Sequence, residues 1–358
     1  ARGEAAHRFA QVCGAVMAKG VEDTLFYRAC RLVALQEVGG APGRFGVSQA
    51  EFHLLQDERA QLWPHTMTTL TTHDTKRSED TRARMLEIAE MPEEFAQLVH
   101  DVFALTPPPD HATGLFLIHN VLGAWPRDGR ATEDFTRRLQ SYAVKAVREA
   151  DVLSSWNDSD AAYETEITEW IGHLTHGPAT RILADFAVHL DRGGVAVSLG
   201  RKLLQLVGPG IPDTYQGTEF LDFSLVDPDN RRFVDYGALK DGVGSPEDVA
   251  KQRIVREALT LRREQPELFL DGGYQAVFAE GAARSHLVGM ARTLAGAPRA
   301  LALATRAPIG LQRSEGWRGT TVTLPEGTWT DRLTGRRFAG RVEVEQLYAE
   351  LPAVLLTR

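Results

Sequence analysis

The sequence lacks the features that mark several large classes of protein. None of its apolar runs approaches the roughly 20 residues needed to cross a bilayer, and no basic-then-apolar signal segment opens it. Only two of its 358 residues are cysteines, Cys13 and Cys30, too few for a disulfide framework in a chain of this length. Their apolar or mixed surroundings favour buried free thiols. A reducing, cytoplasmic location fits this interpretation.

Charge and motifs exclude further chemistries. The formal net charge of −8 is spread along the chain, which argues against a nucleic-acid partner but is compatible with a neutral ligand such as a sugar. The sequence has no GxSxG, HExxH or P-loop motif. The pair His65 and His73 has no Cys or His at metal-ligand spacing nearby. We therefore expect no metal and no organic cofactor.

The first residue is Ala1 rather than Met, and the opening ARGEAAHRFAQVCGAVMAKG starts abruptly. The sequence therefore predicts a piece of a longer polypeptide, in which an N-terminal half precedes this chain. Apolar residues make up 43% and charged residues 25%, which is ordinary globular composition with ample length for one large core and a small second one.

Four consecutive regions of the chain differ in their residue patterns. Residues 1–75 hold short apolar stretches and end in TMTTLTTHD, which predicts a strand at about 66–72. Residues 76–200 show helical spacing in EEFAQLVHDVFAL, in DFTRRLQSYAVKAVREADVLSSW and in ETEITEWIGHL, and Pro107–Pro109 separate the first two stretches. Residues 201–270 combine a short strand near 211–215, a loop at 224–236 and a long helix that stops near Pro266. Residues 271–358 are short β-type runs between Gly and Pro.

This order predicts an α/β protein. Strands alternating with helices and followed by a small β domain indicate the late strands of a partial (β/α)8 TIM barrel, with an inserted helical subdomain and a C-terminal antiparallel β sandwich. We expect late barrel strands and loops in 1–75, the helical insertion in 76–200, the last strand with a substrate loop and helix in 201–270, and the sandwich in 271–358.

The sharpest local feature is THDTKRSED, directly after the predicted strand. In a barrel, residues that end a strand point into the mouth of the active site. A carboxylate and an imidazole there can hold sugar hydroxyls and stabilise an oxocarbenium ion, so His73, Asp74, Lys76 and Arg77 are candidates. The alternative is a solvated, salt-bridged turn that starts a helix, with Asp74 or Thr75 as N-cap.

Two other segments carry polar and aromatic residues. MAKGVEDTLFYR places Lys19, Glu22, Asp23 and Tyr27 around apolar positions, as in a sugar site, although a helix start with acidic residues in its first turn explains the same pattern. GIPDTYQGTEF and SLVDPDNRRFVDY place Tyr215, Asp229 and Asn230 on loops that line a pocket or form surface turns.

Together these segments carry a resemblance to a known family. GIPDTYQGTE and THD resemble the eighth- and seventh-strand motifs of the α-amylase superfamily. MAKGVEDTLFYR, QEVGG, THDTKRSED, LGAWP, VREADVLSSW, SLVDPDNRR and LRREQPELF occur in the order found in maltooligosyltrehalose synthases. The likeness covers about residues 14–270 and is weaker in the final β region.

The resemblance implies a retaining, intramolecular transglucosylation. The α-1,4 bond at the reducing end of a maltooligosaccharide becomes an α,α-1,1 bond, with released glucose rather than water as acceptor. It implies Asp74 as the catalytic transition-state stabiliser. The substrate-binding candidates are His73, Lys19, Glu22, Asp23, Tyr27, Lys76, Arg77, Tyr215, Asp229 and Asn230.

The resemblance also marks what is missing or altered. The superfamily's nucleophile Asp and acid/base Glu follow the fourth and fifth strands, and no matching segment occurs here, so we expect the chain alone to be inactive. The family usually has Lys where Asp151 stands and Pro where Phe233 stands. Two other functions remain open: an α-amylase-type α-glucan hydrolase or transferase, and a noncatalytic carbohydrate-binding fragment.

Overall fold

The computed structural model describes residues 2–28 and 31–358. Its first helix, α1 (Arg2–Val16), is exposed from Gly3 to Val16. Cys13 lies on this helix and is exposed, so the prediction of a buried thiol is wrong there, because no element among the described residues covers this part of α1. Cys30 lies outside the described residues. Within the described ranges, no helix combines the length and apolar character needed to cross a membrane.

The chain folds into two compact units that interleave along the sequence. The helical unit comprises 1–45, 73–191 and 223–232, and the sheet unit comprises 46–72, 192–222 and 233–358. One boundary falls inside the long helix α8 (Thr180–Val207). Each unit is described separately below.

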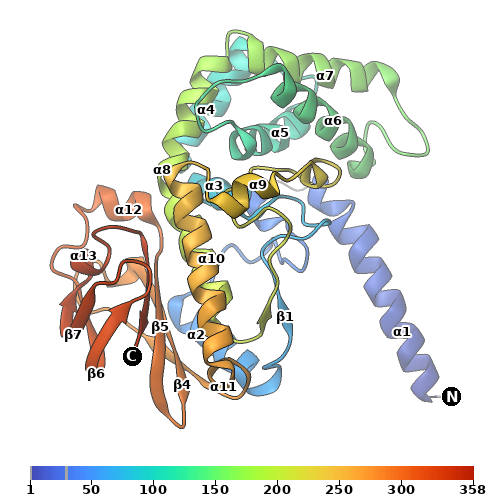
Figure 1. Cartoon of the computed structure of the whole chain (residues 1–358). Coiled ribbons are helices and arrows are strands. Elements are labelled where there is room, and N and C mark those ends of the chain that lie inside the picture. Colours follow the sequence, from blue (N-terminus) through green and yellow to red (C-terminus); the bar gives the residue numbers. More distant parts are fainter. Residues whose placement is uncertain (1, 29–30) are drawn as a thin grey trace. The chain divides into compact units, whose positions relative to one another are not determined.

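The helical unit is organised around α5 (His111–Ala124), in which Gly114 and every residue from Phe116 to Ala124 are buried, so the helix is covered on nearly all of its faces. Asp110 begins this helix by accepting the backbone N–H groups of Ala112 and Thr113 at 3.3 and 2.7 Å. The other helical segments of the unit are η1 (Met17–Glu22), η2 (Leu25–Tyr27), η3 (Val33–Leu35), α3 (Glu79–Leu86), η4 (Glu87–Glu90), α4 (Pro92–Leu105), α6 (Glu133–Ala150), α7 (Ala161–His176) and η5 (Asp229–Arg231). Figure 1 shows α4 to α7 gathered around α5.

Helix α6 is amphipathic and positions much of the candidate site. Its buried residues recur at three- and four-residue spacing, from Phe135 to Val147, and Thr132 caps its N-terminus by accepting the N–H of Phe135 at 3.2 Å. The helical pattern of the sequence extends to Trp156, but α6 ends at Ala150. Asp151 there adopts a left-handed conformation with φ 52°, which stops the helix.

Two short parallel strands form a small sheet within the sheet unit. β1 (Met67–Thr68) pairs with β2 (Ile211–Pro212), and Ile211 N–H donates to the carbonyl of Thr66 at 2.8 Å. Both strands lie within the predicted ranges, and each is shorter than predicted. Further helices of this unit are α2 (Gln49–Leu62), α9 (Tyr236–Asp241), α10 (Pro246–Glu264) and α11 (Pro266–Leu270), and α10 ends as predicted just before Pro266.

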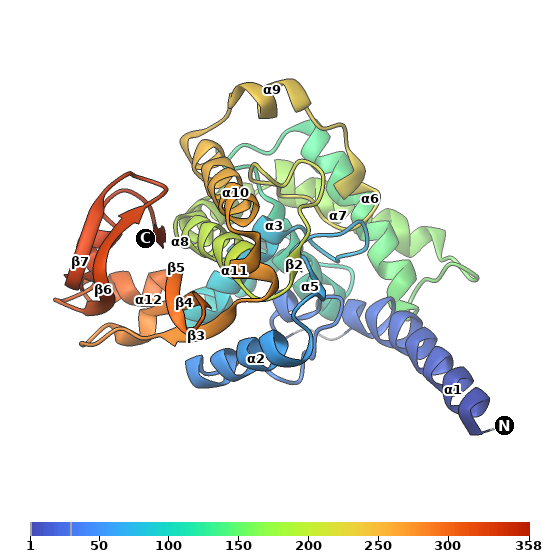
Figure 2. The ribbon, with the colours of Figure 1, turned by 60° about the horizontal axis from the view of Figure 1, so that its bottom comes forward.

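The C-terminal region forms one curled antiparallel sheet. Its strands are β3 (Gly273–Val277), β4 (Leu287–Leu294), β5 (Ala297–Thr305), β6 (Thr321–Asp331), β7 (Arg337–Glu343) and β8 (Ala353–Thr357), in the order β3-β4-β5-β8-β6-β7. Three short helices, η6 (Arg284–His286), α12 (Pro308–Arg313) and α13 (Val344–Leu347), connect them. The predicted sandwich therefore needs correction. β6 pairs with both β7 and β8, so the strands form a half-barrel rather than two separate sheets, and Figure 2 shows this curl.

Each face of this sheet has its own core. Along β5, Ala300 and Ala302 pack with α8 and α10, whereas Leu301 and Leu303 pack inside the curl with Trp329, as alternation along a strand requires. Gly200 on α8 allows the close approach on the helix side, because a Cβ there would lie 2.8 Å from Ala304 Cβ.

Candidate functional site

The segment that follows β1 in the chain turns from exposed to buried within two residues. His73 and Asp74 are exposed, whereas every residue from Thr75 to Thr81 is buried. Helix α3 begins at Glu79 with Ser78 as its N-cap residue. The alternative of a solvated turn with Asp74 or Thr75 as N-cap is therefore wrong, because the polar side chains after Asp74 point into the helical unit.

Lys76 joins this segment to the MAKGVEDT motif. Its ammonium, with the side chain only 2% exposed, donates to Asp23 Oδ1 at 2.7 Å and lies 3.8 Å from Asp74 Oδ1. Asp23 Oδ2 accepts from Lys19 Nζ at 2.5 Å, and the Lys19 side chain is 80% exposed. The two motifs thus meet in a cluster of two lysines and two aspartates, called the Lys76 cluster below.

The cluster shifts the pKa values of two of its members. Burial raises the pKa of Asp23, but hydrogen bonds from Lys19 and Lys76 outweigh it, so the net shift is downward. The hydrogen bond and charge of Asp23 raise the pKa of Lys19. Both groups are therefore charged near neutral pH, and the cluster's formal charges balance. Such a surface offers donors and acceptors to a neutral polyol.

A buried carboxylate that sequence reasoning missed holds the backbone next to Asp74. Glu37 Oε1 accepts the N–H of Lys76 at 2.6 Å and that of Val38 at 3.0 Å, while Oε2 accepts the N–H of Arg77 at 3.2 Å. The residue is 4% exposed. It belongs to the QEVGG motif, whose place in the family resemblance was the only available signal.

Arg77 and Tyr27 lie below the exposed surface. Arg77 is 1% exposed and donates to Asn120 Oδ1 at 2.8 Å and to the Gln36 carbonyl at 2.7 Å. Tyr27 is buried against Phe116, with ring centroids 5.9 Å apart, and burial raises the pKa of its hydroxyl well above the ordinary value. Both side chains support the segments that carry Lys19, Asp23 and Asp74; their predicted contact with substrate stays a prediction.

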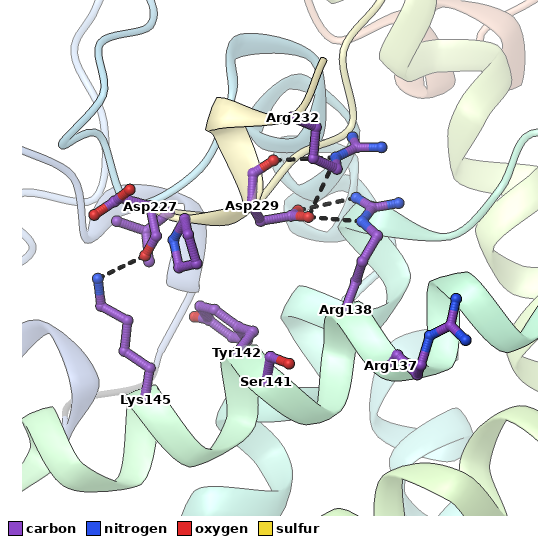
Figure 3. Close-up of a pocket in the computed structure, with 10 residues that line it drawn as sticks. Arg137, Arg138, Ser141, Tyr142, Lys145, Asp227, Asp229 and Arg232 are labelled. Atoms are coloured by element: carbon purple, nitrogen blue, oxygen red, sulfur yellow. Dashed lines mark hydrogen bonds and ion pairs between the residues drawn. The ribbon is translucent and has the colours of Figure 1, made fainter.

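The SLVDPDNRR segment lies beside α6 over a cavity of about 390 Å³. Asp229 receives two hydrogen bonds from Arg138, Nε to Oδ1 at 2.6 Å and Nη2 to Oδ2 at 2.9 Å, and a third from the N–H of Leu225 at 2.8 Å. Figure 3 shows this pair and, farther along α6, Lys145, which donates to the carbonyl of Asp227 at 2.7 Å. Asp229 therefore fixes the segment to α6, and its predicted substrate contact stays a prediction.

The remaining predicted residues occupy three different positions. Asn230 Nδ2 donates to the carbonyl of His73 at 3.0 Å and so ties the SLVDPDNRR segment to the residue before Asp74. Glu22 accepts the N–H of Gly39 at 2.8 Å. Tyr215 belongs to the sheet unit, where its carbonyl accepts from Thr218 after β2. Among the described residues, no group of three or more His, Cys, Asp or Glu is arranged to hold a metal ion.

Comparison with known proteins places this geometry in context. No protein-family model matches the chain. Putative maltooligosyl trehalose synthases from two strains of Mycobacterium tuberculosis are each 46% identical over 356 residues. The match covers 99% of this chain and 46% of each relative, so the chain spans about half the length of these curated relatives.

Solved structures give the same result. Maltooligosyltrehalose synthase from Arthrobacter ramosus superposes with a TM-score of 0.90 at 43% identity, over 99% of this chain and 46% of that one. A hypothetical maltooligosyl trehalose synthase from Sulfolobus tokodaii gives a TM-score of 0.76 at 26% identity, over 96% and 46%. Over nearly its whole length, the chain is thus homologous to about one half of a maltooligosyltrehalose synthase.

Proposed function

We propose that this chain supplies one wall of the active site of a maltooligosyltrehalose synthase, with Asp74 as its catalytic carboxylate. The observation that carries the proposal is the Lys76 cluster. There the exposed Asp74, 56% accessible, stands 3.8 Å from a buried ammonium that is itself held by Asp23. A fixed carboxylate of this kind stabilises positive charge that develops on a sugar ring.

In the proposed reaction, the catalytic carboxylates come from two parts of a longer polypeptide. A nucleophilic carboxylate and an acid/base carboxylate, from the part that the relatives have and this chain does not match, cleave the reducing-end α-1,4 bond with retention. Asp74 stabilises the oxocarbenium-like transition states of both steps. The released glucose stays bound, turns over, and attacks the glycosyl intermediate through its anomeric hydroxyl to form the α,α-1,1 bond.

Lys19, Glu22 and Asp23 would hold the released glucose. Lys19 is exposed and charged, and Asp23 lies at the same surface, so both reach hydroxyl groups of a neutral sugar. His73, whose carbonyl is tied to Asn230, would bind the same ring as Asp74. The intramolecular outcome requires that water be kept from the intermediate while the glucose turns.

The same proposal assigns the two short parallel strands to a barrel. β1 and β2, parallel and hydrogen-bonded, would be the seventh and eighth strands of a (β/α)8 barrel completed by an N-terminal half. The assignment of residues 76–200 as a helical insertion, the division of the chain into four regions and a cytoplasmic location remain predictions.

Product analysis tests the reaction directly. The longer polypeptide, or this chain combined with a separately produced N-terminal half, is incubated with maltohexaose, and the anomeric protons of the products are followed by NMR. The proposal expects α,α-1,1 signals to replace reducing-end signals, whereas the isolated chain should leave maltopentaose and maltohexaose unchanged. Free shorter maltooligosaccharides as the main product would indicate an α-glucan hydrolase instead.

A further inference from the structure

The loop between α6 and α7 exposes a large aromatic ring that no role described above uses. Trp156 is 58% exposed, and one face of its indole lies under the guanidinium of Arg148, whose Cζ is 5.1 Å from the ring centroid. Arg148 forms a bidentate pair with Glu164, both N···O distances being 2.7 Å. One side of the ring is thus supported by a fixed cation.

The loop that carries the ring is held before any ligand arrives. Ser154 Oγ donates to Glu164 Oε1 at 2.6 Å and accepts the N–H of Asp160 at 3.1 Å. The N–H of Ser155 donates to the carbonyl of Asp158 at 3.1 Å. A ring on a loop fixed in this way loses little conformational entropy when it binds a partner.

The start of the loop that carries the ring contacts the MAKGVEDTLFYR segment. Arg28, which follows the MAKGVEDT motif, donates to the carbonyls of Ala150 and Asp151 at the end of α6. Glu149 on that last turn interacts electrostatically with Lys76. Burial raises the pKa of Glu149, and Lys145 and a hydrogen bond with the Trp156 indole oppose that rise. The Glu149 carboxyl therefore interacts with the indole and, through its charge, with Asp23 and Lys76.

These neighbours specify the chemistry of a ligand. An exposed indole face accepts the C–H face of a pyranose, and a carboxyl beside it accepts sugar hydroxyl protons. The surrounding ionisable groups include Lys19, Lys76, Lys145 and Arg148 against Asp23, Asp74, Glu149 and Glu164, so neither an anion nor a cation is favoured. A neutral sugar fits this surface.

We propose that Trp156 and Glu149 form a subsite that stacks one glucose unit of the α-1,4-glucan beside the Lys76 cluster. The inference rests on the proposed function for the identity of the ligand. The indole supplies the stacking face, Arg148 fixes its orientation, and Glu149 accepts a hydroxyl of the stacked unit. Trp156 is a binding residue in this assignment, with no part in bond cleavage.

Fluorine NMR of the chain labelled with 5-fluorotryptophan tests the subsite without any catalytic step. The chain has six tryptophans, and Trp156→Phe identifies the resonance of Trp156. Titration with maltohexaose should shift that resonance and leave those of Trp317 and Trp329 in the curled sheet in place. Trp156→Ala should weaken maltohexaose binding by about tenfold or more, whereas Trp63→Ala, at another exposed tryptophan, should leave it unchanged.

A Trp156 resonance that does not move at saturating maltohexaose, or equal affinity in Trp156→Ala with a native circular dichroism spectrum, overturns the subsite. A chain that binds no maltohexaose overturns it as well. The proposed function fails separately. If maltohexaose shifts the Trp156 resonance but the longer polypeptide forms no α,α-1,1 product, the subsite stands and the proposed function is wrong. If Trp156→Ala forms product at the normal rate with an unchanged KM, the proposed function stands and the subsite is wrong.

Discussion

Lys76 Nζ donates a hydrogen bond to Asp23 Oδ1 at 2.7 Å, and this contact joins two motifs that are 53 residues apart in the sequence. The lysine is buried and the aspartate is partly exposed. A buried ammonium is costly unless a carboxylate compensates for its lost hydration. Asp23 and Asp74 provide that compensation and are thereby held near each other.

Replacing this lysine should release Asp23. In Lys76→Met the pKa of Asp23 should rise toward or above its ordinary value of 3.8, because burial then acts against one hydrogen bond fewer. In the wild type, the ionised Asp23 contributes stability that is fully present above about pH 3.8 and is lost as the pH falls through its lowered pKa. The stability difference between wild type and variant should therefore shrink in acid.

Carbon NMR of the Asp23 carboxyl group, followed against pH, measures that shift. Lys240→Met, on the exposed surface of α9, is the control and should leave the Asp23 titration in place. An unchanged Asp23 pKa in Lys76→Met would contradict the assigned contact.

Glu37→Gln should loosen the backbone beside Asp74. A glutamine presents one oxygen and one NH2 group, so one of the N–H groups of Lys76 and Arg77 that Glu37 accepts would face a donor. Leaving a buried donor unsatisfied costs about 1–3 kcal/mol. Hydrogen exchange at these two amides should accelerate, while Glu93→Gln on the exposed start of α4 should not affect it. Equal exchange in both variants would show that Glu37 does not hold the segment.

Two adjacent arginines on α6 offer a matched comparison. Arg138→Leu breaks the bidentate pair with Asp229, whose side chain is 8% exposed, and should destabilise the chain by about 3–5 kcal/mol. Arg137 pairs with Asp134, and both side chains are more than 60% exposed, so Arg137→Leu should change stability by less than about 1 kcal/mol. Urea unfolding of both variants distinguishes the two cases, and similar losses would contradict the structural role of Asp229.

Glu87 should make stability depend on pH above the acid range. Burial, together with Glu90, raises its pKa to about 9. A carboxyl with a raised folded pKa contributes stability that is fully present below its unfolded pKa and is lost as the pH rises toward the folded one. Stability should therefore fall between about pH 4.5 and 9, by up to about 1.4 kcal/mol per pH unit from this group.

Glu87→Gln removes this titration. Thermal unfolding of the variant should show a flatter pH profile over that range and a higher melting temperature at pH 8, because no charge has to be buried. Parallel profiles for wild type and variant would mean that Glu87 is not the group responsible.

The sequence predicted the elements better than the relations between them. Periodicity located α4, α6, α7 and α10, and β-branched residues located β1. Charge patterning alone favoured a solvated turn for THDTKRSED. Burial of Lys76 and Arg77 depends on contacts with Glu37, Asp23 and Asn120, which are separated from them in sequence by 39 to 53 positions. The family motifs identified these segments, but their pairing required coordinates.

Other differences also have local causes. The helical pattern up to Trp156 misled because a left-handed Asp151 ends α6 and releases the loop that exposes the indole. The curled sheet differs from a sandwich through a bulge in β6 and its two-residue pairing with β8, details that strand spacing does not encode.

The central claim is that Asp74 acts in an intramolecular transfer, and reducing-end content over time tests it most directly. With the longer polypeptide and maltohexaose, reducing ends should fall while total carbohydrate stays constant, and Asp74→Asn should slow this loss by on the order of 10³-fold. A rise in reducing ends would mean hydrolysis, and near-normal loss in Asp74→Asn would contradict the role assigned to Asp74.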